Sequence, residues 1–536
     1  MEKPAVLERA SNESQAGRAN PSEESGLQRL LARIGESYGL FALLGIALLS
    51  HSYSMFRYPL YLGDEGIYLE QAWAVLRQGK LSPYTYFYDH APAGWLLLAW
   101  WILLLPGKFL TFGMSVNSGR VLMLLIHLVS VILLYRVTKK LSGSDAAAIV
   151  TVVIFSLSPL SLYYQRMILL DNLMVFWLLI SMHLLLSDDN RVLTLVGSGM
   201  AFGLAVLTKE NAVFFAPVLG YVLYSNVRRT HRLRFAVAGW TGTFLMTVSL
   251  YPLYALLKSE LFPSLSTIVT SAPAEHVSLI STLFWQVGRH GGSILDPYSD
   301  FWTFFWAKWW FKDPTILVAG AVATLANLLV GWQGRRRGHL VAALMALVFA
   351  FYLGRGSVIL EFYVVPVLPF LALNVGLLVD EVLRRLPGAL ALLLLVGGLA
   401  VLCGVFVIRS YDHYTLDLTQ LQIQQVSYVR KTMPPDAVLL VDDDLWVDLH
   451  EPARGRPVFR NAHSHWKIAN DPDIRDRLLN GDWRNIDYLI MSNKLAEEFD
   501  RQYTEDRLPV QALQHSEVIW SLQKGDVHLE IRKVSK

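Results

Sequence analysis

The sequence predicts a polytopic α-helical membrane protein with about eleven transmembrane helices and a C-terminal extracytoplasmic α/β domain. Of its 536 residues, 53% are hydrophobic and 17% are charged, and the mean hydropathy is +0.37. Soluble globular proteins carry about a quarter charged residues, so a single large soluble domain is disfavoured. Apolar runs close to the length of a membrane crossing recur up to residue 408, and the composition turns polar from residue 411.

The charge balance and the cysteine content exclude several classes of function. The net charge is +3, and no basic tract is long enough to indicate nucleic-acid binding. Cys403 is the only cysteine and lies in an apolar run. Neither an intramolecular disulfide nor a cysteine-based zinc site can therefore form.

The chain divides into three predicted parts. Residues 1–37 are polar and lack the apolar core of a signal peptide, which predicts a disordered cytoplasmic tail. Residues 38–408 form the predicted transmembrane domain, and residues 409–536 form the predicted extracytoplasmic domain. The expected spans are 38–57, 119–138, 146–164, 171–186, 193–208, 211–226, 235–257, 314–332, 339–353, 362–383 and 388–408.

The basic residues indicate which ends of these spans are cytoplasmic, because cytoplasmic loops are enriched in Lys and Arg. With a cytoplasmic N-terminus, every basic cluster lies on the cytoplasmic side, provided that the short apolar run 94–105 stays at the outer surface. The clusters are Arg29 with Arg33, Lys139-Lys140, Arg191, Arg228-Arg229 with Arg232 and Arg234, Arg335-Arg336-Arg337, and Arg384-Arg385. We expect a multi-pass protein of the plasma membrane with outward-facing segments at 58–118, 258–313 and 409–536.

Two features of the outer segments have alternative interpretations. The aromatic stretch 301–311 is typical of a segment in the lipid headgroup layer, and contact with a lipid-linked substrate is the alternative. Strands are expected at 437–441, 488–491 and 527–531. The run Asp442-Asp443-Asp444 follows the first of them and predicts a solvated turn, with a metal or sugar site as the alternative.

Ionisable residues recur at the outer ends of the predicted spans. Charges at such positions are costly unless they are hydrated, paired or lining a cavity, which makes them functional candidates. We therefore predict that these side chains converge on one outward-facing polar site. The candidates are Asp64, Glu65, Asp89, His90, Arg166, Asp171, Lys209, Glu210, Arg355 and Glu361, together with Tyr68 and Tyr363 beside them.

The order of these elements resembles the membrane glycosyltransferases of the C superfold, in particular the group of protein O-mannosyltransferases and lipid A aminoarabinose transferases. The resemblance covers residues 38–383. The matching segments are Asp64-Glu65, Asp89-His90-Ala91-Pro92-Ala93-Gly94, Arg166 to Asp171, Leu207-Thr208-Lys209-Glu210-Asn211, and Tyr363-Val364-Val365-Pro366-Val367-Leu368-Pro369. The family often has two prolines after its His or Lys, whereas this chain has His90-Ala91-Pro92.

The resemblance implies a sugar donor linked to polyprenyl phosphate and transfer, with inversion, to a protein, glycan or lipid acceptor at the outer face of the membrane. It also implies that Asp64 is the catalytic base. The leaving lipid phosphate needs cations already in place, and the candidates are His90, Arg166, Lys209 and Arg355. Glu65, Asp89 and Asp171 would orient those cations or hold the acceptor. Further pocket candidates are Tyr68, Glu210, Glu361 and Tyr363.

Two alternatives stay open at this point. The sequence establishes no required cofactor, and a divalent cation is possible. Asp64, Glu65, Asp89, His90 and Asp171 are oxygen and nitrogen ligands suited to such a cation, although their spacing forces no ligand set. The rival function is a polytopic transporter or lipid flippase with an outward-facing polar cavity. Transporters often carry charges mid-span and a repeat between halves. Here the charges sit at outer ends and no such repeat is apparent, which favours the transferase.

Overall fold

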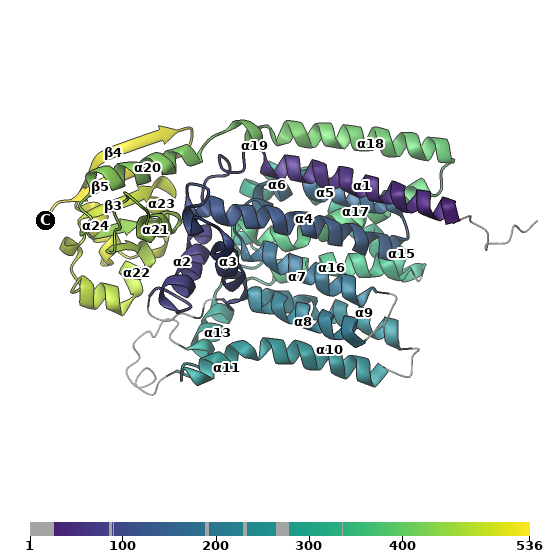
Figure 1. Ribbon diagram of the computed structural model, residues 1–536, viewed down its shortest axis with the longest axis horizontal. Coiled ribbons are helices and arrows are strands. Elements are labelled where there is room, and N and C mark those ends of the chain that lie inside the picture. The colour runs from purple at the N-terminus through teal and green to yellow at the C-terminus, as the bar shows by residue number, and fades with distance from the viewer. Residues whose placement is uncertain are drawn as a thin grey trace, which may run out of the picture.

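The computed structural model describes residues 26–84, 88, 90–187, 192–228, 233–263, 278–334 and 336–536. A bundle of long helices lies beside a smaller part that contains the β-sheet, and the two are joined through α2 (Gly63–Gln78) and α20 (Thr419–Thr432) (Figure 1). The chain begins at the far end of the bundle and ends in the sheet-containing part. The predicted Asp89 lies outside the described residues.

The bundle consists of helices that follow the predicted apolar runs. They are α1 (Gly26–Ser52), α4 (Ser115–Ser142), α5 (Asp145–Leu157), α6 (Pro159–Gln165), α7 (Leu170–Leu185), α8 (Val192–Thr208), η2 (Glu210–Phe215), α9 (Ala216–Val227), α10 (Leu233–Val248), α11 (Leu250–Leu257), α15 (Pro314–Gln333), α16 (Arg337–Gly354), η4 (Glu361–Val367), α17 (Leu368–Leu383) and α18 (Gly388–Arg409). Helix α1 begins before the predicted boundary at residue 38.

Among the described residues, six helices are long and apolar enough to cross a membrane. The pair α5 and α6 would make a seventh, bent by 62°. Pro159 begins α6 and lacks the N–H that a continuous helix needs at that point, which accounts for the bend. The chain is thus a multi-pass membrane protein, and the count of eleven spans stays a prediction.

Shorter helices complete the segments that are predicted to face outward. The helix α3 (Ala93–Leu104) has 12 residues, about 18 Å at 1.5 Å per residue, which is too short for a bilayer core of about 30 Å. This length fits the expectation that the run 94–105 does not cross. The 258–313 segment contains α13 (Leu279–Gly288), α14 (Asp300–Phe304) and the π-helix η3 (Phe305–Trp310).

The C-terminal part contains a mixed five-stranded sheet in the order β2-β1-β3-β5-β4. Strands β2, β1 and β3 are parallel, while β5 and β4 are antiparallel to their neighbours. The strands are β1 (Leu439–Val441), β2 (Ala462–Ser464), β3 (Tyr488–Ser492), β4 (Ser516–Lys524) and β5 (Val527–Val534). The surrounding helices are α19 (Tyr411–Thr415), α20, α21 (Asp443–His450), α22 (His465–Asn470), α23 (Asn493–Gln502) and α24 (Leu508–Gln514). Strands β1, β3 and β5 lie at the three predicted positions.

Helix α2 packs directly on α21, and a glycine makes the close approach necessary. A Cβ placed on Gly66 would lie 2.1 Å from the backbone oxygen of Asp443. The same packing buries the acidic run after β1, since Asp443 and Asp444 are 4% and 3% exposed. The prediction of a solvated turn at Asp442-Asp443-Asp444 is therefore wrong, because α2 covers the turn that the local sequence would leave in water.

We expect Gly66→Ala to destabilise the protein by about 1–3 kcal/mol, the usual cost of overpacking a closely packed contact. The measurement is the free energy of unfolding in mixed micelles. Gly404→Ala in α18 is the matched control, because a Cβ at Gly404 has no heavy atom within 4 Å. Equal stability of the two variants would contradict the close contact between α2 and α21.

Candidate functional site

The first turn of α2 is held in place by a fully buried ion pair. Arg120 of α4 binds Glu65 through two hydrogen bonds, Nη2 to Oε2 at 2.7 Å and Nε to Oε1 at 3.0 Å. Both side chains are 0% exposed. Glu65 also accepts from the backbone N–H groups of Leu62 and Ile168. The carboxylate is fully occupied, so Glu65, a predicted acceptor-binding or orienting residue, has the surroundings of a structural anchor.

A second buried pair joins α7 to the end of α8. Lys209 Nζ donates to Asp171 Oδ2 at 2.6 Å, and both side chains are almost completely buried. The ammonium lies 4.3 Å from the ring centroid of Tyr363 and 5.0 Å from that of Phe362. Burial alone would lower the pKa of Lys209, but Asp171 and Tyr363 raise it to about 12, so the cation is retained. The other oxygen of Asp171, Oδ1, is buried without a partner among the described residues.

Asp64 lies in the first turn of α2, one residue before the anchored Glu65. It is partly buried, and its carboxylate has no hydrogen-bond or ion-pair partner in the described part of the chain. Burial raises the pKa of Asp64 from 3.8 to about 6, while Lys209 and His90 oppose the rise and Asp171 and Glu361 add to it. We call these five residues the Asp64–Lys209 cluster. The charges of the other four residues all act on the carboxylate of Asp64.

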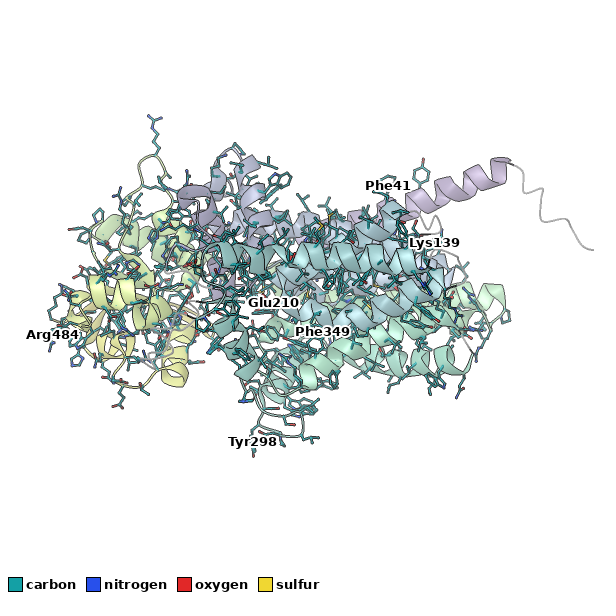
Figure 2. All side chains as sticks on the ribbon, turned by 90° about the horizontal axis from the view of Figure 1, so that it is seen from below. Phe41, Lys139, Glu210, Tyr298, Phe349 and Arg484 are labelled. Carbon is teal, nitrogen blue, oxygen red and sulfur yellow. The ribbon has the colours of Figure 1, made fainter. Side chains whose placement is uncertain are left out.

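The segment before α3 is fixed by Glu210. Its carboxylate accepts from the backbone N–H of Ala91 at 2.6 Å and lies 3.1 Å from His90 Nδ1. Burial acts to raise the pKa of Glu210, but the interaction with His90 outweighs it and holds that pKa below its usual value. The hydroxyl of Tyr251 donates to the carbonyl of His90. Glu210 lies toward the sheet-containing part, whereas Lys139 lies toward the opposite end of the bundle (Figure 2).

Two lysines that were not among the predicted residues lie near Glu361. Lys308 Nζ is 3.3 Å from Glu361 Oε2, and the indole of Trp309 donates to the Glu361 carbonyl. Lys312 lies 3.6 Å from the ring centroid of Tyr163. Burial lowers the pKa of Lys312 to about 8. The aromatic stretch 301–311 therefore also contributes a cation and an indole that contact a predicted site residue.

The structure keeps three of the predicted residues apart from this cluster. Arg166 donates to the backbone carbonyls of Ser50, Tyr53, Tyr58 and His413, which uses its guanidinium to tie loops together. Arg355 is exposed, and its guanidinium carbon lies 3.7 Å from the ring centroid of Tyr352. The ring of Tyr352 lies between Arg355 and the ring of Tyr363 in this series of contacts. Tyr68 is 3% exposed and belongs to a hydrophobic cluster.

Within the described ranges, no group of three or more His, Cys, Asp or Glu side chains is placed to hold a metal ion. Asp171 is hydrogen-bonded to Lys209, and the charge of the same lysine acts on Asp64. Since Asp89 lies outside the described residues, the predicted ligand set is incomplete here.

Comparison with known proteins adds to this geometry. The family model for dolichyl-phosphate-mannose-protein mannosyltransferase matches residues 89–252. ArnT from Cupriavidus metallidurans, solved with undecaprenyl phosphate, aligns with a TM-score of 0.56 and 16% identity over 93% of this chain and 98% of that chain. The chain has the glycosyltransferase C fold. The resemblance stated from the sequence is thereby confirmed.

A second solved structure shares the glycosyltransferase C fold. AglB, the archaeal oligosaccharyltransferase from Archaeoglobus fulgidus, was solved with an inhibitory peptide and a dolichol-phosphate. It aligns with a TM-score of 0.57 and 12% identity over 93% of this chain and 74% of that chain. No curated protein matches the sequence. The matched range 89–252 includes His90, Asp171, Lys209 and Glu210.

We expect Glu65→Gln to destabilise this glycosyltransferase C fold by about 3–5 kcal/mol, because Arg120 would keep a buried charge without its counter-charge. The free energy of unfolding in mixed micelles measures the loss. Arg477→Gln is the control, since it breaks an exposed pair with Asp473 that contributes less than about 1 kcal/mol. A loss no larger than that of the control would show that the Arg120 charge is neutralised by other groups.

Proposed function

We propose that the chain is a membrane glycosyltransferase that moves a sugar from a polyprenyl-phosphate donor to an acceptor at the outer face of the membrane. The observation that carries the proposal is the carboxylate of Asp64, which has no partner among the described residues, beside the buried Lys209–Asp171 pair. The fold shared with proteins solved with undecaprenyl phosphate and dolichol-phosphate supports a lipid-phosphate donor. The basic clusters support a cytoplasmic N-terminus in the plasma membrane.

Asp64 is the proposed base for an acceptor hydroxyl or amine. The carboxylate takes the proton of the acceptor while the acceptor atom bonds to the anomeric carbon of the sugar. The bond between that carbon and the phosphate oxygen breaks, and the lipid phosphate leaves with the electron pair. One displacement inverts the anomeric centre. A pKa of about 6 suits this role, since a general base works best with a pKa near the working pH.

Lys209 is the proposed counter-charge for the leaving phosphate. A lysine ammonium has three N–H donors, and Asp171 accepts one of them. The positive charge is little screened in a buried position, so it favours the negative charge that develops on the phosphate oxygen. His90, held by Glu210, is a second group whose charge acts on Asp64. A divalent cation stays an additional proposal for this phosphate, and no step above depends on it.

The rate of sugar transfer should depend on pH through the ionisation of Asp64. Asp64 accepts a proton only when ionised, so the rate of polyprenyl-phosphate release should rise with pH and reach half of its plateau near pH 6. Asp64→Asn should reduce the plateau rate by 10²-fold or more and remove this pH dependence, since general base catalysis contributes about 10²–10⁴-fold. The assay uses purified protein, a panel of polyprenyl-phosphate sugars and candidate acceptors, with and without chelator. The exposed Asp526→Asn is the matched control and should leave the rate unchanged. Turnover by Asp64→Asn close to that of the control would remove Asp64 from the reaction.

The second prediction separates the charge of Lys209 from its structural role. Lys209→Gln should weaken binding of polyprenyl phosphate by about 10-fold or more, since a hydrogen bond to a charged group contributes about 1.5–3 kcal/mol. It should also destabilise the fold, because Asp171 is left as an unpaired buried charge. The double variant Lys209→Gln with Asp171→Asn removes both charges and should recover stability but not lipid binding. Normal lipid binding by that double variant would make the phosphate assignment wrong.

A further inference from the structure

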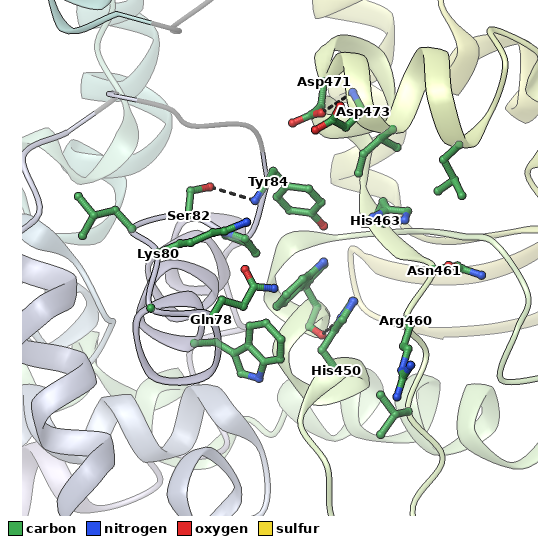
Figure 3. Close-up of a pocket in the computed structure, with 18 of the residues that line it drawn as sticks. Gln78, Lys80, Ser82, Tyr84, His450, Arg460, Asn461, His463, Asp471 and Asp473 are labelled. Atoms are coloured by element: carbon green, nitrogen blue, oxygen red, sulfur yellow. Dashed lines mark hydrogen bonds between the residues drawn. The ribbon is translucent and has the colours of Figure 1, made fainter. Parts of the chain in front are cut away.

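A cavity of about 1030 Å³ lies away from the Asp64–Lys209 cluster, between the end of α2 and the C-terminal part (Figure 3). One wall comes from residues 78–84, another from the end of α11, and the rest from α21, β2 and the segment near Asp471. Its volume is at the upper end of the range for ligand pockets, about 300–1,000 Å³. Asp64 and Trp73, which lines the cavity, are 9 residues apart on α2. At 1.5 Å per residue the cavity therefore begins about 14 Å along the helix from the proposed base.

Aromatic rings form the part of the wall nearest α2. Trp73 and Trp446 meet edge to face with ring centroids 5.2 Å apart, and Tyr84 lies 5.9 Å from Trp446. The imidazole of His450 stacks on Trp446 at 3.6 Å. These contacts fix the rings in place, which gives the cavity a preformed apolar face.

His463, in the same wall, has polar atoms without a partner among the described residues. They are both of its ring nitrogens, and the side chain is 9% exposed. Buried polar groups are nearly always hydrogen-bonded, and leaving one unpaired costs about 1–3 kcal/mol. Two such atoms on the wall of one cavity indicate a bound polar molecule.

The charges around the cavity balance. Lys80, Lys258 and Arg460 are opposed by Glu260, Asp471 and Asp473. Burial lowers the pKa of His450 to about 4 and that of His463 to about 3, so both imidazoles are neutral at pH 7. A neutral imidazole offers one donor and one acceptor. The wall thus carries no excess charge for an anionic or cationic ligand, and it offers donors and acceptors beside a flat apolar face.

We propose that this cavity binds a neutral carbohydrate, as a second site that holds part of a glycan acceptor. A sugar has hydroxyl groups that both donate and accept, matching the two ring nitrogens of His463, and C–H faces that pack on aromatic rings. The role as an acceptor site rests on the proposed glycosyltransfer. Because the cavity begins about 14 Å along α2 from Asp64, the acceptor would be an oligosaccharide long enough to reach both sites.

The test measures binding without donor or turnover. The purified full chain is applied to an array of neutral oligosaccharides with sulfated and sialylated oligosaccharides as charged comparisons, and the affinity for the strongest neutral binder is measured by calorimetry. His463→Phe keeps the ring but removes both nitrogens, so we expect at least a tenfold loss of affinity. The melting temperature should stay equal or rise, because two unpaired polar atoms are gone. His515→Phe, whose ring stacks on Trp483 outside the cavity, should leave affinity unchanged.

Binding of no neutral oligosaccharide would overturn this proposal, as would equal affinity of His463→Phe and the wild-type chain. A preference for charged oligosaccharides that His463→Phe leaves intact would overturn it as well. The outcome is independent of the transferase assay. Glycan binding without polyprenyl-phosphate release would contradict the proposed function alone, and release without glycan binding would contradict the cavity assignment alone.

Discussion

The buried Glu65–Arg120 ion pair is the interaction on which the arrangement of the outer face depends. Arg120 also donates to the backbone carbonyls of Met55 and Pro59, and Glu65 accepts from the backbone of Ile168. Two charges buried together need this many partners, since their desolvation is repaid only when the remaining donors and acceptors are satisfied. The pair thereby joins α2, α4 and the segments that follow α1 and precede α7. Asp64 is held one residue away from this fixed point.

Adjacent carboxylates therefore have opposite surroundings. Glu65 has every acceptor occupied, whereas Asp64 has no partner among the described residues and lies within range of the charge of Lys209. Successive residues of a helix point about 100° apart, so one can face α4 while the other faces α8 and the η4 segment. The sequence Asp64-Glu65 alone does not indicate which carboxylate is the base and which is the structural anchor. Only the family resemblance favoured Asp64 as the base.

Much of the fold could be predicted because apolar run length and basic flanks are properties of the sequence itself. The apolar runs became helices, and three strands were placed by their β-branched and aliphatic residues. The site was harder to predict than the fold, because hydropathy indicates the depth of a residue in the membrane but not the direction of its side chain. Arg166 and Lys209 are both predicted at outer ends of spans, yet Arg166 donates to backbone carbonyls and Lys209 donates to Asp171. Lys308 was missed since its aromatic surroundings are also typical of an interface anchor.

Helix α2 connects the two regions that carry the chemistry. Its first turn holds Asp64, and its last turns contact the C-terminal part, where Trp73 and Arg77 both donate to the buried carboxylate of Glu451. Gly66 allows α21 to pack against the same helix. An α-helix anchored by buried contacts along its length transmits position without bending, so the proposed base and the aromatic wall of the cavity stay at a fixed separation. The C-terminal part is thus built into the enzyme proposed here, because removing it would expose the face of α2 that carries Gly66 and Trp73.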